Sequence, residues 1–134
     1  MAKKVFLSFN FKEKNYLNDA RNLFAPYLGT LEATPIFVER DVSENGPKAI
    51  EQEIQRVMGP CVGLIVVVGD VAHNSPWIDY ELGYANSAKI PKIAVRHPNA
   101  TGGVPNNHRG MTVLEWNSSE LAAAIRGWPS TRSP

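Results

Sequence analysis

The amino-acid sequence predicts an α/β protein with a flavodoxin-like fold, a three-layer sandwich around a five-stranded parallel sheet. Segments with strand character and segments with helical spacing alternate five times along the chain, which is typical of a parallel sheet with helices on both faces. The most apolar segment, residues 61–68, is too short to span a membrane and rich in β-branched residues, as expected of a strand buried on both faces. The natural order for five such strands is 2-1-3-4-5, with right-handed crossovers.

The composition is that of a single folded domain. A chain of 134 residues, 43% of them hydrophobic and 20% charged, is large enough to bury a core and differs from a disordered protein. We expect the domain to cover residues 3–126, followed by a C-terminal tail at residues 127–134. The formal net charge of +1 and the scattered basic residues argue against a nucleic acid as the partner.

Cysteine usage and the apolar segments indicate a cytoplasmic protein. Cys61 is the only cysteine, so the sequence predicts neither an internal disulfide nor a thiolate metal cluster. The opening MAKKVFLSF fits a first strand better than a signal peptide, and no later apolar segment is long enough to cross a bilayer. We therefore expect no membrane partner.

Turn and capping residues mark the boundaries between the elements. Gly29 ends the first helix, Ser75 is a suitable N-cap with Pro76 at the first helical position, and a Ser118–Ser119 pair is expected to cap the last helix. The predicted strands are residues 3–10, 35–39, 61–68, 92–96 and 111–116. The predicted helices are residues 15–28, 47–58, 76–89 and 118–126.

Residues 97–110 form a long polar connection rich in glycine and proline. A connection of this length is either functional or mobile, and mobility is the default expectation. His97 and His108 in this connection, together with His73, lack the spacing of metal ligands. We expect all three to be surface histidines, and no metal site.

The helix that follows the central strand carries the candidate catalytic residue, Glu81. Helical spacing places Trp77, Glu81 and Ala85 on one side of this helix, at the carboxyl end of the central strand, where α/β sheets bind ligands. A carboxylate held between Trp77 and Tyr84 would be partly desolvated, and its raised pKa would mark a functional site. The alternative is an ordinary glutamate favoured by the helix dipole.

The predicted strand order places a crevice between the ends of the first and third strands. Its polar residues either bind ribose and phosphate oxygens or satisfy strand-end amides, and Phe9 either stacks on a base or covers the core. Arg40, in the polar loop that follows the second strand, is a plausible phosphate contact or a solvated charge. The residues expected to line the crevice below Glu81 are Ser8, Phe9, Asn10, Gly69 and Asp70.

Several chemistries are excluded by missing motifs. Neither GxGxxG nor GxxxxGK[ST] is present, so a bound nucleotide would be a substrate rather than a tightly held cofactor. No GxSxG surrounds Ser75, which argues against a nucleophilic serine. The first strand ends in Ser-Phe-Asn, whereas a receiver domain needs clustered acidic groups there to hold Mg²⁺.

Four segments in order resemble Toll/interleukin-1 receptor (TIR) domains. They are KKVFLSFN, RDVSENGPKAIEQEIQRVM, CVGLIVVVGD and, above all, the Ser-x-Trp-x-x-x-Glu pattern of SPWIDYEL. They look closest to the small TIR-like proteins of Thoeris-type bacterial anti-phage systems. The resemblance covers residues 3–126, nearly the whole chain.

The resemblance implies roles for individual residues. Glu81 matches the family's catalytic glutamate, and Trp77 begins the same motif. Ser8 and Phe9 match the end of the first strand, where the family commonly has an aromatic residue that covers the nucleotide; phenylalanine replaces the more usual tyrosine. The loop from Arg40 to Gly46 matches one that contacts a neighbouring protomer or the substrate. The region after the fourth strand lacks the regular helix expected of the family.

The activity implied by the resemblance is cleavage of the nicotinamide–ribosyl bond of NAD⁺, with NAD⁺ as substrate and no cofactor. A carboxylate near the ribose stabilises the oxocarbenium-like state. The product is ADP-ribose or a cyclic ADP-ribose isomer, sensed by a downstream effector. Two alternatives stay open: a non-enzymatic interaction module that self-associates through the Arg40 to Gly46 loop, and a nucleoside deoxyribosyltransferase-like hydrolase.

Overall fold

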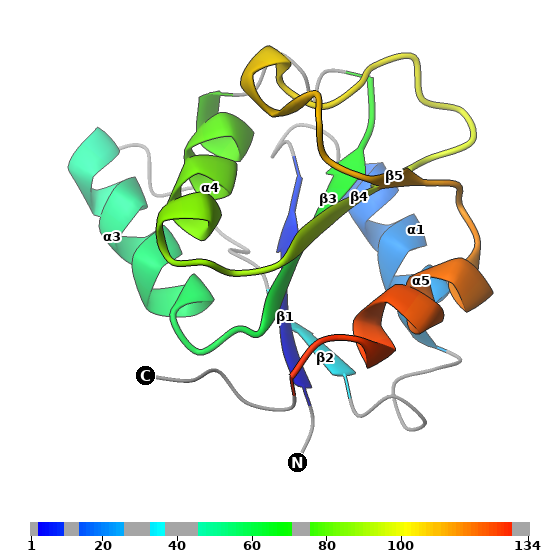
Figure 1. The fold of residues 1–134 in the computed structure, drawn as a ribbon. Coiled ribbons are helices and arrows are strands. Elements are labelled where there is room, and N and C mark those ends of the chain that lie inside the picture. The colour runs from blue at the N-terminus through cyan, green and yellow to red at the C-terminus, as the bar shows by residue number, and fades with distance from the viewer. Residues whose placement is uncertain (1–2, 10–13, 26–32, 37–45, 71–75, 130–134) are drawn as a thin grey trace.

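The computed structural model of the chain describes residues 3–9, 14–25, 33–36, 46–70 and 76–129, which form a parallel sheet with helices on both faces (Figure 1). The strand order is β2-β1-β3-β4-β5, and all neighbouring strands run parallel. The predicted α/β class with a parallel sheet is confirmed. The strands are β1 (Lys3–Ser8), β2 (Ala33–Ile36), β3 (Gly63–Val68), β4 (Lys92–Arg96) and β5 (Val113–Leu114). The helices are α1 (Lys14–Phe24), α3 (Pro47–Met58), α4 (Pro76–Ser87), the 3-10 helix η4 (Asn106–His108) and α5 (Ser118–Arg126).

The central strand β3 lies between β1 and β4, and all six of its residues are buried. The apolar segment at residues 61–68 therefore forms the strand that its composition predicts. The strand begins at Gly63 because the backbone before it still closes the preceding helix, where the N–H of Cys61 donates to the carbonyl of Met58.

Successive side chains of a strand point to opposite faces of the sheet and pack into hydrophobic cores on the two faces. Phe6 and Leu64 pack with residues of α3 and α4, whereas Leu7 and Ile65 pack with residues of α1 and α5. Figure 1 shows α3 and α4 on one face of the sheet and α1 and α5 on the other. The α3/α4 core contains Phe6, Ile54, Met58, Cys61, Leu64, Val66, Val68, Ile78, Leu82, Ala85, Ile90 and Ala94.

Helix α4 ends earlier than the sequence predicts, at Ser87 instead of residue 89. Lys89 has a positive φ of 58°, and the N–H of Ile90 donates to the carbonyl of Ala85 across 2.8 Å. This six-residue closure with a left-handed residue is a Schellman motif, which ends helices. The buried side chain of Ile90 holds the turn against the core.

Helix α5 has the predicted bounds but a different cap. The side chain of Asn117 accepts hydrogen bonds from the backbone N–H groups of Ser119 and Glu120, at 2.8 and 3.1 Å. The Ser118–Ser119 pair lies inside the first turn instead. The prediction of a serine cap was wrong because the side-chain oxygen one residue earlier reaches both unpaired N–H groups.

Residues 97–111, which make up nearly all of the connection between β4 and β5, are attached to the body of the domain, and we call this segment the strap. It contains η4, and its Gly102 and Pro105 are buried. Strand β5 is shorter than the predicted residues 111–116, since only Val113 and Leu114 pair with β4. Across the described ranges, no helix is long and apolar enough to cross a membrane.

Candidate functional site

Glu81 lies in the second turn of α4 on the face that packs against the sheet. The buried residues of this helix are Ile78, Glu81, Leu82 and Ala85, which recur at three- and four-residue spacing. Only 6% of the Glu81 surface is exposed to solvent. A carboxyl thus occupies a position that the helical pattern assigns to the core.

Ser8 is the hydrogen-bond partner of Glu81. It is the last residue of β1 and is completely buried, and its hydroxyl donates to Oε1 of Glu81 across 2.7 Å. Ser8 follows Phe6 by two residues, so both side chains point toward the face that α4 covers. The sheet and the helix therefore each supply one member of a buried polar pair.

Burial raises the pKa of Glu81 from its ordinary value of 4.5 to about 8, and the hydrogen bond from Ser8 opposes this rise. Desolvation penalises the charged carboxylate, whereas a donor aimed at it favours the charge. At neutral pH the Glu81 carboxyl is therefore mostly protonated, and a modest change in its surroundings suffices to ionise it. A perturbed carboxyl of this kind is a mark of functional sites.

Trp77 is half-buried and packs against the same core as Tyr84. Its ring meets that of Tyr80 edge to face, with 5.9 Å between centroids. Trp77 thus contributes packing area one turn before Glu81, as large aromatic side chains do.

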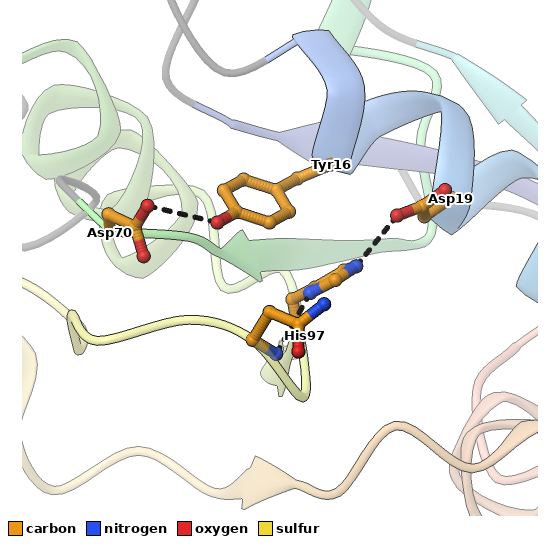
Figure 2. A network of polar contacts seen from close by, with 5 residues as sticks. Tyr16, Asp19, Asp70 and His97 are labelled. Atoms are coloured by element: carbon orange, nitrogen blue, oxygen red, sulfur yellow. Dashed lines mark hydrogen bonds and ion pairs between the residues drawn. The ribbon is translucent and has the colours of Figure 1, made fainter.

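Asp70, just past the end of β3, is held by residues from two other segments. Its carboxylate accepts a hydrogen bond from the Tyr16 hydroxyl at 2.9 Å (Figure 2). It also accepts hydrogen bonds from the Thr101 N–H at 2.9 Å and the Thr101 hydroxyl at 3.2 Å. The Thr101 backbone bond and then the Tyr16 bond lower the pKa of Asp70. Asp70 is therefore an ionised anchor that joins α1, β3 and the strap.

His97, directly after β4, is a residue whose position the sequence analysis misjudged. Its ring is buried, Nε2 lies 2.7 Å from Oδ2 of Asp19, and Nδ1 accepts the N–H of Asn99 at 3.2 Å. Its ring centroid lies 4.4 Å from that of Tyr16 and 4.9 Å from that of Trp116. Figure 2 shows His97, at the start of the strap, pointing toward Asp19, and Tyr16, on α1, pointing toward Asp70.

His108 is also shielded, with 9% of its side chain exposed and Nε2 at 3.0 Å from Oδ1 of Asp79. Among the described residues, that buried oxygen of Asp79 has no hydrogen-bond partner. The expectation of surface histidines was wrong for His97 and His108, and His73 lies outside the described residues. The one sequence signal that could have identified His97 as a buried polar residue is its position directly after β4, because polar groups gather at the carboxyl ends of parallel strands.

The predicted crevice residues separate onto two sides of the sheet. Ser8 joins Glu81 on the α3/α4 side, whereas Phe9 packs into the cores formed with α1 and α5. Gly69 is buried at the end of β3, where the strap backbone approaches it at Gly102. Asn10 and Arg40, the rest of the loop up to residue 45, and Ser75 lie outside the described residues.

Within the described segments, no group of three or more His, Cys, Asp or Glu side chains is arranged to hold a metal ion. Cys61 is buried, and its thiol lies 3.4 Å from the carbonyl of Val57 in hydrogen-bond geometry. The chemistry available to the described site is therefore that of Glu81, its hydroxyl partner and the neighbouring aromatic residues.

Comparison with known families gives a match over most of the chain. The family model described as "Thoeris protein ThsB, TIR-like domain" matches residues 6–102. The matched segment contains both Ser8 and Glu81 and ends inside the strap. A comparison with curated proteins gives no match.

Proposed function

The chain belongs to the family of TIR-like domains of the Thoeris protein ThsB, and from this premise we propose that it is an NAD⁺-cleaving enzyme of bacterial anti-phage defence. Glu81 is the catalytic carboxylate of this proposal. NAD⁺ is the substrate and no cofactor is needed. The product, ADP-ribose or a cyclic ADP-ribose isomer, is the signal that a downstream effector senses in the cytoplasm.

The observation that carries this proposal is the buried carboxyl of Glu81. A carboxyl with 6% exposure whose hydrogen-bond partner among the described residues is Ser8 contributes less to stability than an apolar side chain in the same place. Glu81 lies one helical turn from the start of α4, beside the end of the sheet. A buried carboxyl that lowers stability at such a place is typical of a group retained for chemistry.

The proposed reaction breaks the bond between the nicotinamide nitrogen and C1′ of the ribose. The bonding electron pair leaves with nicotinamide, which becomes neutral, and positive charge develops on the ribosyl group. The ionised Glu81 stabilises this charge electrostatically. Water then adds to C1′ and releases a proton to give ADP-ribose, or a nucleophilic atom of the same molecule adds to give a cyclic product.

Glu81 must be ionised to act in this way, and the substrate itself favours that state. The nicotinamide ring of NAD⁺ carries a positive charge, and an opposite charge nearby lowers the pKa of a carboxyl. We expect NAD⁺ binding to displace the proton that Glu81 holds at neutral pH, where its pKa is about 8.

The remaining substrate contacts are proposed from the resemblance and from the predicted strand order. Trp77 supplies aromatic surface to the nucleotide. Phe9 and Gly69 act instead as packing residues, because Phe9 packs into the cores formed with α1 and α5 and the strap backbone approaches Gly69. Asn10 and Arg40 complete the set as ribose and phosphate contacts. Asp70, which the sequence analysis also proposed, acts in our view through the strap that it anchors, because its carboxylate already accepts three hydrogen bonds.

The test is nicotinamide release from NAD⁺ by the purified chain, with and without a crowding agent, compared with Glu81→Gln. We expect Glu81→Gln to lower the rate at least about 100-fold, the lower range for losing a preorganised charge. Glu120→Gln, at an exposed position of α5, is the matched control and should keep full activity. Unchanged release by Glu81→Gln would refute the assignment.

The same variants separate the enzyme from an interaction module. In cells that carry the defence system, the enzyme proposal expects Glu81→Gln to abolish protection from phage. Protection that survives Glu81→Gln but is lost on substitution of residues 40–46 would instead support self-association through that loop as the function.

A further inference from the structure

We propose that Ser8 is a positioning residue for Glu81: the serine at the end of β1 orients the carboxyl and favours its ionised form, rather than touching the substrate. This inference rests on the proposed function, since it concerns the same site. It assigns to Ser8 a role different from the substrate contact that the sequence suggests.

The burial of Ser8 is the first support. Its exposed fraction is 0%, and its hydroxyl lies between the sheet and α4. A buried hydroxyl needs a partner, because leaving it unpaired costs free energy comparable to a lost hydrogen bond. Its single hydrogen is used on Oε1 of Glu81, so it has no donor left for a ribose or phosphate oxygen.

The position of Ser8 in the sheet fixes the direction of this hydrogen bond. Ser8 pairs in register with Val66 of β3, a residue with no exposed surface in the same core as Ile78 and Leu82 of α4. A strand paired on both sides holds its side chains more rigidly than a loop does. The hydroxyl therefore selects which oxygen of Glu81 faces the sheet and leaves Oε2 as the oxygen that can face the substrate.

The chemistry of the pair gives the second support. Among the described residues, the Ser8 hydroxyl is the one hydrogen-bond partner of the Glu81 carboxyl. Burial disfavours the carboxylate, and the Ser8 bond is the contact that acts the other way on the pKa. Removing this donor should make Glu81 harder to ionise, which a purely structural serine would not do.

The test measures the ionisation of Glu81 directly in the whole chain. The carbon-13 carboxyl signals of glutamate are followed by NMR from pH 4 to 10, and the Glu81 signal is identified by its absence in Glu81→Gln. We expect Ser8→Ala to raise the pKa of Glu81 by about one unit, since a hydrogen bond to a charged group contributes about 1.5 kcal/mol or more. Ser87→Ala, at an exposed position of the same helix, is the control and should leave the signal unchanged.

Kinetics give a second readout. With the pKa of the free enzyme raised by one unit, Ser8→Ala should lower kcat/KM for nicotinamide release about tenfold at pH 7, because kcat/KM reports the ionisation of the free enzyme. The lost rate should return as the pH rises above the new pKa, whereas a misfolded site would not recover. Ser8→Cys keeps a similar side-chain volume but its thiol donates weakly, so its rate of nicotinamide release should lie between those of wild type and Ser8→Ala. It replaces Ser8→Ala in the test if that variant does not fold.

The two possible failures are distinguishable. If the Glu81 signal titrates at the same pH in wild type, Ser8→Ala and Ser8→Cys, the role of Ser8 is refuted whatever the activity. If the titration shifts as expected but Glu81→Gln still releases nicotinamide at the wild-type rate, the proposed function is refuted, while the pairing of Ser8 with Glu81 stands.

Discussion

Glu81 makes the folded protein hold a proton that the unfolded chain releases. Its pKa is about 8 in the fold and 4.5 without it, because burial penalises the charged form. Asp70, just past the end of β3, shifts in the opposite direction because its carboxylate accepts three hydrogen bonds. The two carboxyls show that the number of donors and the degree of burial, rather than the residue type, decide the sign.

The raised pKa of Glu81 predicts a pH dependence of stability. Between pH 4.5 and 8 the folded state binds more protons than the unfolded state, so the contribution of Glu81 is fully present below pH 4.5 and is lost as the pH rises through 8. The slope that Glu81 adds is at most about 1.4 kcal/mol per pH unit. Glu81→Gln, which keeps an oxygen for the Ser8 hydroxyl, should be more stable than wild type at pH 9.

Urea unfolding of wild type and Glu81→Gln at pH 5, 7 and 9 measures this effect. The difference in the free energy of unfolding between the two proteins should grow from pH 5 to pH 7 and level off above pH 8, since all other titrating groups are common to both. Curves that run parallel across this range would show that Glu81 ionises normally in the folded protein.

At the scale of the element, α4 carries the candidate catalytic carboxyl and ends in a strained turn. Lys89 adopts the left-handed conformation at the position that glycine usually takes in a Schellman motif. A side chain in that conformation costs about 1–2 kcal/mol relative to the right-handed one. The strain is retained because Ile90 must turn inward to reach the core and Pro91 cannot continue the helix.

We predict that Lys89→Gly stabilises the protein by about 0.5 to 1 kcal/mol, which is the relieved strain less the greater freedom of glycine in the unfolded chain. Thermal and urea unfolding measure it. Ser87→Gly introduces the same residue two positions earlier, within the helix, and should bring no gain. A loss of stability in Lys89→Gly would mean that the turn carries no strain.

The ends of α5 show how side chains far from the site complete an element. Asn117 caps its start, and the ammonium of Lys3 donates to the carbonyl of Ile125 at 2.9 Å and lies 3.4 Å from that of Arg126. A cation at a helix C-terminus satisfies unpaired carbonyls and interacts favourably with the dipole. The first strand thus stabilises the last helix.

At the scale of the whole molecule, the strap joins elements on both faces of the sheet. It contacts α1 through a histidine–aspartate pair, the end of β3 through hydrogen bonds to a carboxylate, and α4 through a second histidine–aspartate contact. The three attachments are His97 with Asp19, Thr101 with Asp70 and His108 with Asp79. The default expectation of a mobile connection therefore does not describe these residues.

The strap approaches the end of β3 so closely that only glycine fits at residue 102. A Cβ atom there would lie 2.5 Å from the carbonyl oxygens of both Gly69 and Asp70. We predict that Gly102→Ala destabilises the protein by about 1–3 kcal/mol, the range for overpacking against a rigid backbone. It should also speed amide hydrogen exchange across residues 97–111 more than in β3.

Gly103→Ala is the matched control for this prediction, because a Cβ atom at residue 103 would meet nothing within 4 Å. Hydrogen exchange and urea unfolding of the two variants and wild type make the comparison. Equal stability of Gly102→Ala and Gly103→Ala would contradict the close approach of the strap to β3.

Local patterns in the sequence were sufficient for the α/β class, the buried central strand and the placing of Glu81 beside the core-facing stripe of its helix. Each of these follows from the spacing of the apolar residues. A spacing of two residues in a strand, or of three and four residues in a helix, indicates which face the element buries. The cap of α5 and the end of α4 needed finer knowledge of which side chain reaches which N–H group, and there the sequence predictions were off by one or two residues.

The tertiary structure decided which groups meet. Ser8 lies 73 positions from Glu81 and His97 lies 78 from Asp19, and nothing in the local pattern around any of them identifies its partner. The sheet order brings β1 beside β3 and so places Ser8 under α4, and burial then makes each polar group take the partner within reach. The sequence by itself therefore determined the carboxyl, its face and the direction of its pKa shift, whereas its hydroxyl partner and the attachment of the strap arise only from long-range packing.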